Sequence, residues 1–70
     1  MLFKNKQQNG GILTKREKLV LKLVGMGCSN KQIADRLFIS SETVKKHLKN
    51  AYKKLGACNK IEALRKAKII

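Results

Sequence analysis

Apolar residues recur at helical spacing in four segments of this 70-residue chain. The first segment follows Thr14 and Glu17, which fit a capping box in which each side chain accepts a hydrogen bond from the other residue's backbone N–H. Gly25 and Gly27 are placed to end this helix near Met26. Its buried face is predicted to consist of Leu19, Val20, Leu23 and Val24.

The next two segments lie close together and predict a pair of helices. Ser29 or Asn30 can cap a helix of about two turns, with Ile33, Ala34 and Leu37 on its buried side. Ser40 can cap the following helix, over about residues 41–55, and Gly56 can end it. The apolar stripe of this longer helix is predicted to be Val44, Leu48, Ala51 or Tyr52, and Leu55.

Phe38 and Ile39 form the turn between these two helices. The turn contains no glycine, so it is expected to close with ordinary backbone angles. Its two apolar side chains are expected to pin the helices together. Two helices joined by a tight turn, at about residues 29–49, predict a helix-turn-helix, in which one helix enters the DNA major groove and the other braces it.

A fourth helix is predicted after Asn59, with Ile61, Leu64 and Ala67 on one side. The chain has no alternating strand pattern, no proline and no internal repeat. The predicted fold class is therefore all-α, a four-helix bundle-like domain with a central helix-turn-helix. Residues 1–12 are polar and predict a flexible tail or linker, and residues 13–70 form the domain.

The net charge of the chain indicates which class of partner it binds. The chain has 17 Lys and Arg against 4 Asp and Glu, a formal net charge of +13. This excess repels itself in a compact monomer and suits a polyanion. Aromatic residues are few (Phe3, Phe38 and Tyr52), which argues against single-stranded nucleic acid, because its binders stack bases on aromatic side chains.

The face of the third helix opposite its apolar stripe presents Ser41, Glu42, Lys45, Lys46, Lys49, Asn50 and Lys53, and residues 40–56 hold five lysines against one glutamate. Lysine can donate to guanine O6 and N7, so the candidates for reading bases are Lys45, Lys46 and Lys49. The candidates for contacting phosphates are Asn30, Lys31, Ser41, Thr43, Asn50 and Lys53. A solvated lysine face, with Asn30 acting only as a cap, is the competing interpretation.

Catalytic and metal-binding chemistry is not indicated. Cys28 and Cys58 stand 30 positions apart with one histidine in the chain, which gives no zinc spacing. His47 has no nucleophile or carboxylate pair near it and is expected to be partly packed. The start of the chain has no apolar run long enough for a signal or membrane segment. We expect no enzyme activity, no metal, no cofactor and a cytoplasmic location.

Several spaced motifs resemble the LuxR/FixJ-type C-terminal DNA-binding domain over about residues 13–66. They are Leu13-Thr14-Lys15-Arg16-Glu17, Gly27-Cys28-Ser29-Asn30-Lys31-Gln32-Ile33-Ala34, Ser40-x-x-Thr43-Val44-Lys45-x-His47 and Lys54-Leu55-Gly56. The resemblance implies that the third helix enters the major groove, with Lys45, Lys46 and Lys49 facing bases and Thr43 and Asn30 near phosphates. It also implies that the fourth helix pairs two copies near Leu64, Arg65 and Lys68.

One position departs from the family pattern. Many members have arginine where this chain has Lys60, and lysine cannot make a planar two-point bond to a carboxylate. A pairing between Glu17 and Lys60 would therefore be looser.

Two function classes compete. The first is a sequence-specific transcription regulator that binds double-stranded DNA as a homodimer, with RNA polymerase as a candidate partner. The second is a basic helical adaptor that docks on an acidic protein or an anionic membrane. A membrane helix would carry a broad exposed apolar face, whereas the third helix directs its apolar stripe to the core. The sequence therefore favours the regulator, with no membrane partner.

Overall fold

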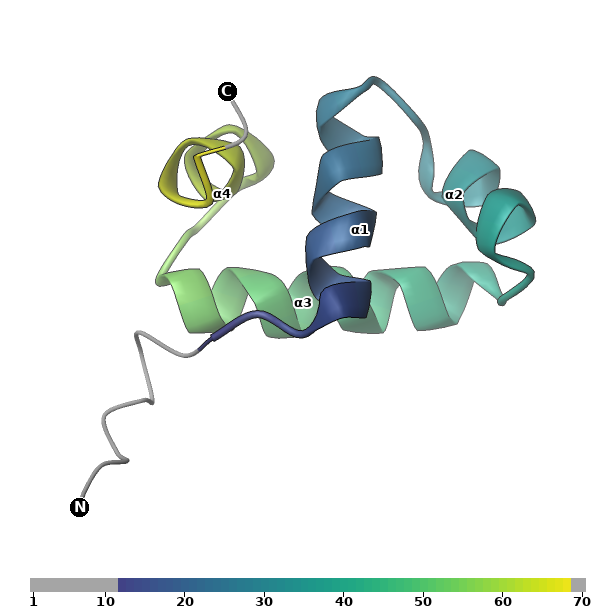
Figure 1. The fold of residues 1–70 in the computed structure, drawn as a ribbon, viewed down its shortest axis with the longest axis horizontal. Helices are drawn as coiled ribbons and strands as arrows, with labels where there is room; N and C mark the ends of the chain where they lie inside the picture. The colour runs from purple at the N-terminus through teal and green to yellow at the C-terminus, as the bar shows by residue number, and fades with distance from the viewer. Residues whose placement is uncertain (1–11, 69–70) are drawn as a thin grey trace, which may run out of the picture.

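The computed structural model describes residues 12–68, and within them it contains four helices and no strand (Figure 1). The helices are α1 (Lys15–Gly25), α2 (Asn30–Leu37), α3 (Ser41–Leu55) and α4 (Lys60–Lys66). The predicted all-α class with four helices is confirmed. The predicted tail and the apolar pair Ile69-Ile70 fall outside the described residues, apart from residue 12.

The longest helix, α3, is the base of the domain (Figure 1). Helix α1 crosses it near its middle, α2 lies at its N-terminal end and α4 near its C-terminal end. Helices α1, α2 and α4 all contact α3, and α1 also contacts α2 and α4. The core therefore lies between α1 and α3, and the two outer helices close its ends.

Side-chain caps begin all four helices. Thr14 and Glu17 form the expected capping box, with N···O distances of 3.0 and 2.9 Å. At α2 the cap is Ser29, which forms a second capping box with Gln32. Ser40 caps α3 and Asn59 caps α4. These caps were predictable because each is a local bond between a side chain and a backbone N–H three residues away.

The core is made of small and branched apolar side chains. The residues that are fully buried include Val20, Leu21, Ile33, Val44, Ala51 and Ala63. The predicted stripe of α3 is confirmed, with Leu48, Tyr52 and Leu55 half-buried against the core.

Two residues that were predicted to be buried, Leu19 and Ile61, are exposed. Leu19 is 40% exposed, and Leu21 is fully buried in its place, because α1 packs against all three other helices and buries a wider face than one stripe. Ile61 is 51% exposed, and Ala63 is buried instead, because the short helix α4 touches the core with the face that carries Ala63 and Leu64.

The turn between α2 and α3 also differs from its prediction. Phe38 adopts a left-handed conformation with φ 58°, and its side chain is 93% exposed. The N–H groups of Phe38 and Ile39 both donate to the carbonyl of Ala34, which closes the end of α2. Only Ile39 packs against the core. Backbone hydrogen bonds and Ile39 therefore hold a conformation that costs a non-glycine residue about 1–2 kcal/mol.

Candidate nucleic-acid interface

The N-terminus of α2 offers backbone donors to an anion. Since Ser29 is the cap, Asn30 is the first residue of the helix and is half-buried, and Lys31 next to it is exposed. The first N–H groups of a helix have no partner within the helix and carry the positive end of its dipole. Asn30 and Lys31 therefore lie where a phosphate would be attracted.

The first turn of α3 presents hydroxyl groups. Ser40 Oγ accepts from the N–H of Thr43 (3.1 Å) and lies 2.9 Å from Thr43 Oγ1. Whichever hydroxyl donates in this pair, the proton of the other hydroxyl stays available for a phosphate oxygen. Ser41 and Thr43 are both half-buried. The cap therefore orients a donor at the start of the helix.

A lysine face covers the solvent side of α3. Lys45, Lys46, Lys49 and Lys53 are all exposed, as is Asn50. The buried residues Val44 and Ala51 lie on the opposite side. Lys46, Lys49 and Lys53 follow one another at i, i+3 and i+7, so they form a row along the helix. The structure thus brings together the three base-facing candidates and the phosphate candidates Asn50 and Lys53.

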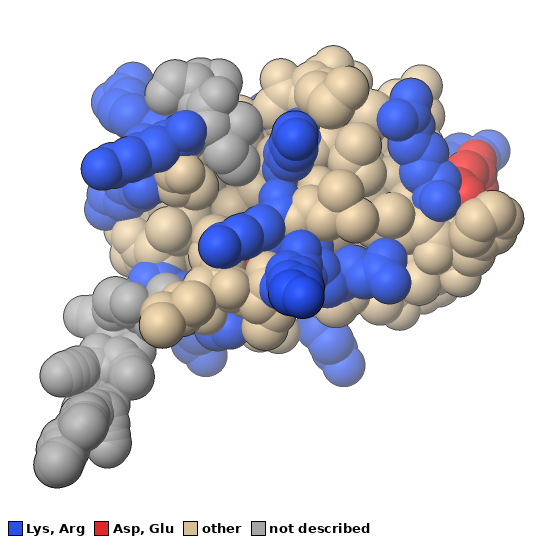
Figure 2. Space-filling view, in the orientation of Figure 1, with Lys and Arg blue, Asp and Glu red and all other residues tan. Residues whose placement is uncertain are grey.

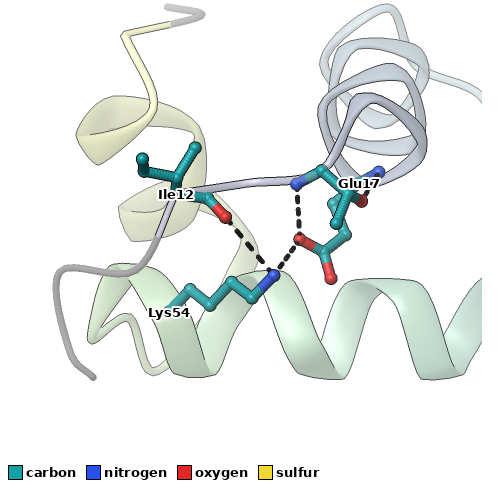
Figure 3. A network of polar contacts seen from close by, with 4 residues as sticks. Ile12, Glu17 and Lys54 are labelled. Atoms are coloured by element: carbon teal, nitrogen blue, oxygen red, sulfur yellow. Dashed lines mark hydrogen bonds and ion pairs between the residues drawn. The ribbon is translucent and has the colours of Figure 1, made fainter. Parts of the chain in front are cut away.

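Lys54 does not belong to this face. Its Nζ lies 2.8 Å from Glu17 Oε1 and 3.4 Å from the carbonyl oxygen of Ile12, so it ties the end of α3 to the start of α1 (Figure 3). The expected pairing of Glu17 with Lys60 is wrong, because Glu17 lies over α3 rather than over α4. Within residues 12–68, Lys60 is in neither ion pair.

Glu17 is a buried carboxylate that stays charged. Its exposed fraction is 4%, and this burial alone would raise its pKa. Hydrogen bonds from Lys54 and Thr14, together with the Lys54 charge, outweigh burial and lower the pKa below its usual 4.5. The ion pair therefore persists at neutral pH. It ties the end of α3 to the first turn of α1.

Few acidic groups offset the lysines and arginines of the surface. Glu17 is buried, Glu62 Oε2 lies 3.7 Å from Lys66 Nζ, and Asp35 and Glu42 are exposed. Figure 2 shows lysine and arginine spread over one face of the domain, with acidic atoms confined to its edge near α2. A surface of this kind attracts a polyanion from a distance.

The dimer candidates on α4 and just beyond it divide between core and surface. Leu64 is 4% exposed and holds α4 on the core, whereas Arg65 and Lys68 are exposed. Ile61 is exposed beside Arg65 in a shallow hollow that Cys58 also lines. Sequence reasoning missed Ile61 as a surface residue, because the apolar spacing of α4 does not show which of its sides is covered.

Sequence comparison relates this chain to larger bacterial proteins. It is 51% identical over 51 residues to the nitrate/nitrite response regulator protein homolog of Haemophilus influenzae, covering 73% of this chain and 24% of that protein. It is 40% identical over 62 residues to the CsgBAC operon transcriptional regulatory protein of Escherichia coli, covering 89% of this chain and 29% of the relative.

The fold is also found among solved structures. The crystal structure of response regulator ChrA from a heme-sensing two-component system matches with a TM-score of 0.72 and 44% identity. The match covers 84% of this chain and 31% of ChrA. The chain therefore spans less than a third of the length of each of these three proteins.

The family model described as bacterial regulatory proteins, luxR family, matches residues 11–67. This range takes in all four helices, including the helix-turn-helix of α2 and α3. The chain belongs to the luxR family of bacterial regulatory proteins and carries its DNA-binding helix-turn-helix domain.

Proposed function

We propose that this domain binds duplex DNA sequence-specifically and thereby regulates transcription, with α3 in the major groove. The observation that carries this proposal is the exposure of Lys45, Lys46 and Lys49 on a helix whose other side is packed on the core. The major groove is about 12 Å wide and admits one α-helix. Residues near the start of such a helix reach base edges, and later residues reach phosphates.

The interface divides into two kinds of contact. Lys45, Lys46 and Lys49 reach toward guanine O6 and N7. The phosphate contacts flank them on both sides, from the start of α2 and along α3. We assign these contacts to Asn30, Lys31, Ser41, Thr43, Asn50 and Lys53.

Two single substitutions test this division. Lys49→Ala is expected to relax preference at one position of the site, because a good base contact gives about 1–3 kcal/mol of discrimination. Lys31→Ala is expected to weaken all sequences alike, because phosphate contacts carry no sequence information directly. The preferred site is first selected from a random duplex pool, and affinities are then measured for that site and its single-base variants.

Lys15→Ala is the matched control, because Lys15 is an exposed lysine at the start of α1, on the side of that helix opposite its buried residues. It should leave both affinity and preference close to those of the unchanged chain. A uniform loss of affinity in Lys49→Ala would contradict the base-reading role of this residue.

The remaining features of the proposal follow from the target. We infer a cytoplasmic location, because bacterial DNA lies there, and RNA polymerase is the candidate partner of the DNA-bound regulator.

We propose no catalytic role: His47 is half-buried on α3, and within residues 12–68 no three His, Cys, Asp or Glu side chains come together. A membrane-docking adaptor would need an exposed apolar face, whereas the stripe of α3 is packed on the core. Among the helices of the described part, none is long and apolar enough to cross a membrane.

We further propose that two copies pair on DNA through α4, with half-sites about 10 base pairs apart. The exposed part of α4 that supports this contact is Ile61 with Arg65, and Lys68 lies just beyond the helix. Leu64 contributes by holding α4 in place.

Thiol crosslinking tests the pairing. Cys58 is exposed beside Ile61, so in a Cys28→Ser chain a short bismaleimide should join two copies on a duplex with two half-sites. Adding Ile61→Lys should abolish both the crosslink and cooperative binding, because two lysines would face each other at the two-fold axis. Binding to a single half-site should survive. Cooperative binding that persists in Ile61→Lys would place the dimer contact elsewhere.

A further inference from the structure

A groove lies between α1 and the residues that follow α4, and no residue of the helix-turn-helix lines it. Its lining within residues 12–68 is Leu13, Lys18, Lys22, Ala67 and Lys68, and it encloses about 460 Å³. Leu13 and Ala67 are half-buried against the core and provide the apolar part of the wall. The three lysines are exposed around it. The groove is therefore an apolar hollow with a cationic rim.

The charges on this rim are unmatched within residues 12–68. The two ion pairs there use Lys54 and Lys66, and none of the chain's four acidic residues lines the groove. Lys18 and Lys22 lie one helical turn apart, where like charges repel. Lys68 adopts a left-handed conformation with φ 61°, which is unfavourable for a residue with a side chain. An anionic ligand would relieve the repulsion.

The groove faces away from the proposed DNA interface. On α1, Lys15, Lys18 and Lys22 follow at i, i+3 and i+7, on the side opposite the buried residues of that helix. On α3, the lysine face likewise lies opposite the buried stripe. Because α1 and α3 pack with their buried sides together, their lysines point to opposite sides of the domain. DNA on α3 would leave the groove open.

We infer that this groove docks a short acidic segment of a partner protein that carries one apolar side chain. Carboxylates would pair with Lys18, Lys22 and Lys68, and the apolar side chain would lie against Leu13 and Ala67. A second DNA duplex fits less well, because its outer surface consists of charged phosphates and offers no protruding apolar group to fill the hollow. Ligand pockets of about 300–1,000 Å³ suffice for small ligands, so this groove has room for the anchoring side chain.

The test uses the 70-residue chain saturated with a duplex that carries a single half-site, so that the α3 lysines are occupied while α4 and Lys68 are not paired with a second copy. Two labelled peptides are compared by fluorescence anisotropy: a run of glutamates with one central leucine, and the same peptide with serine in place of leucine. The leucine peptide should bind roughly tenfold more tightly, since burying a leucine side chain favours binding. In NMR spectra, the methyl signals of Leu13 and Ala67 should shift on binding.

Matched charge variants identify the site. Lys18→Ala with Lys22→Ala should weaken the leucine peptide roughly tenfold. Arg16→Ala with Lys60→Ala removes the same charge from exposed positions outside the groove and should have little effect. Equal losses in the two double variants, or equal affinity for both peptides, would overturn the proposal in favour of general charge attraction.

Two further outcomes would also overturn it: displacement of the peptide by a second duplex, or self-association through the groove in sedimentation. Failure of the chain to bind its duplex is scored separately, because it would contradict the proposed function and not the groove. In that case, the leucine peptide is added to the protein without DNA. A shift of the Leu13 and Ala67 methyl signals would support the groove, and unchanged signals would contradict it.

Discussion

Raising the salt concentration fourfold is expected to weaken duplex binding about twelvefold for each copy of the domain. Two of the residues assigned to phosphates are exposed lysines, Lys31 on α2 and Lys53 on α3. Each phosphate that a cation neutralises contributes about −0.9 to the slope of log K against log salt, so these two contacts give a slope of about −1.8. Titrations of one duplex at several salt concentrations measure this slope.

Paired variants localise the effect. Lys31→Ala with Lys53→Ala should reduce the magnitude of the slope by about 1.8. Lys18→Ala with Lys22→Ala removes the same charge from the opposite side of the domain and should leave the slope nearly unchanged. A flat salt response would contradict the DNA-binding proposal, and equal effects of the two pairs would contradict the placement of DNA on α3.

Replacing Glu17 with alanine is expected to lower the free energy of unfolding by about 2–3 kcal/mol. The substitution removes the acceptor for the Thr14 N–H and leaves Lys54, which is half-buried, without its carboxylate partner. A domain of this size has only about 4–10 kcal/mol of stability in total, so the loss would be a large part of it. Urea denaturation followed by circular dichroism measures the change.

The lowered pKa of Glu17 makes the free energy of unfolding depend on pH. Because the folded pKa of Glu17 is lowered, its contribution is fully present above its ordinary pKa of 4.5 and is lost as pH falls through the folded value. Glu17→Gln should therefore flatten the fall in stability below about pH 4.5. Glu62→Gln is the comparison, because hydrogen bonding from the Cys58 N–H also lowers the pKa of that carboxyl, but at a more exposed site. An unchanged pH profile in Glu17→Gln would contradict the role of the ion pair.

Local chemistry explains which parts of the fold could be predicted from the sequence. The caps at Thr14, Ser40 and Asn59 depend on neighbours three residues away, so the pattern of residue types suffices to find them. The exposure of Leu19 and Ile61 depends on how many other helices each face meets, and helical spacing alone does not contain that information.

The candidate site shows the same limit. The lysine row of α3 could be predicted, because it is the complement of an apolar stripe in one helix. The partner of Glu17 could not: Lys54 lies 37 positions away in the chain and reaches Glu17 only through the crossing angle of two helices. The groove of Leu13 and Ala67 is still more remote in sequence, since its walls come from opposite ends of the domain.

Because the side chain of Phe38 is exposed, the conformation of the turn between α2 and α3 does not depend on which side chain stands at position 38. Main-chain hydrogen bonds to Ala34 and the packing of Ile39 close this turn, while the ring of Phe38 lies almost wholly in solvent. The position is therefore an attachment point: an environment-sensitive fluorophore there would adjoin both helices of the proposed interface and displace no core atom. Asparagine or glycine, which accept a left-handed backbone more readily, would suit the same position in an engineered version of the domain.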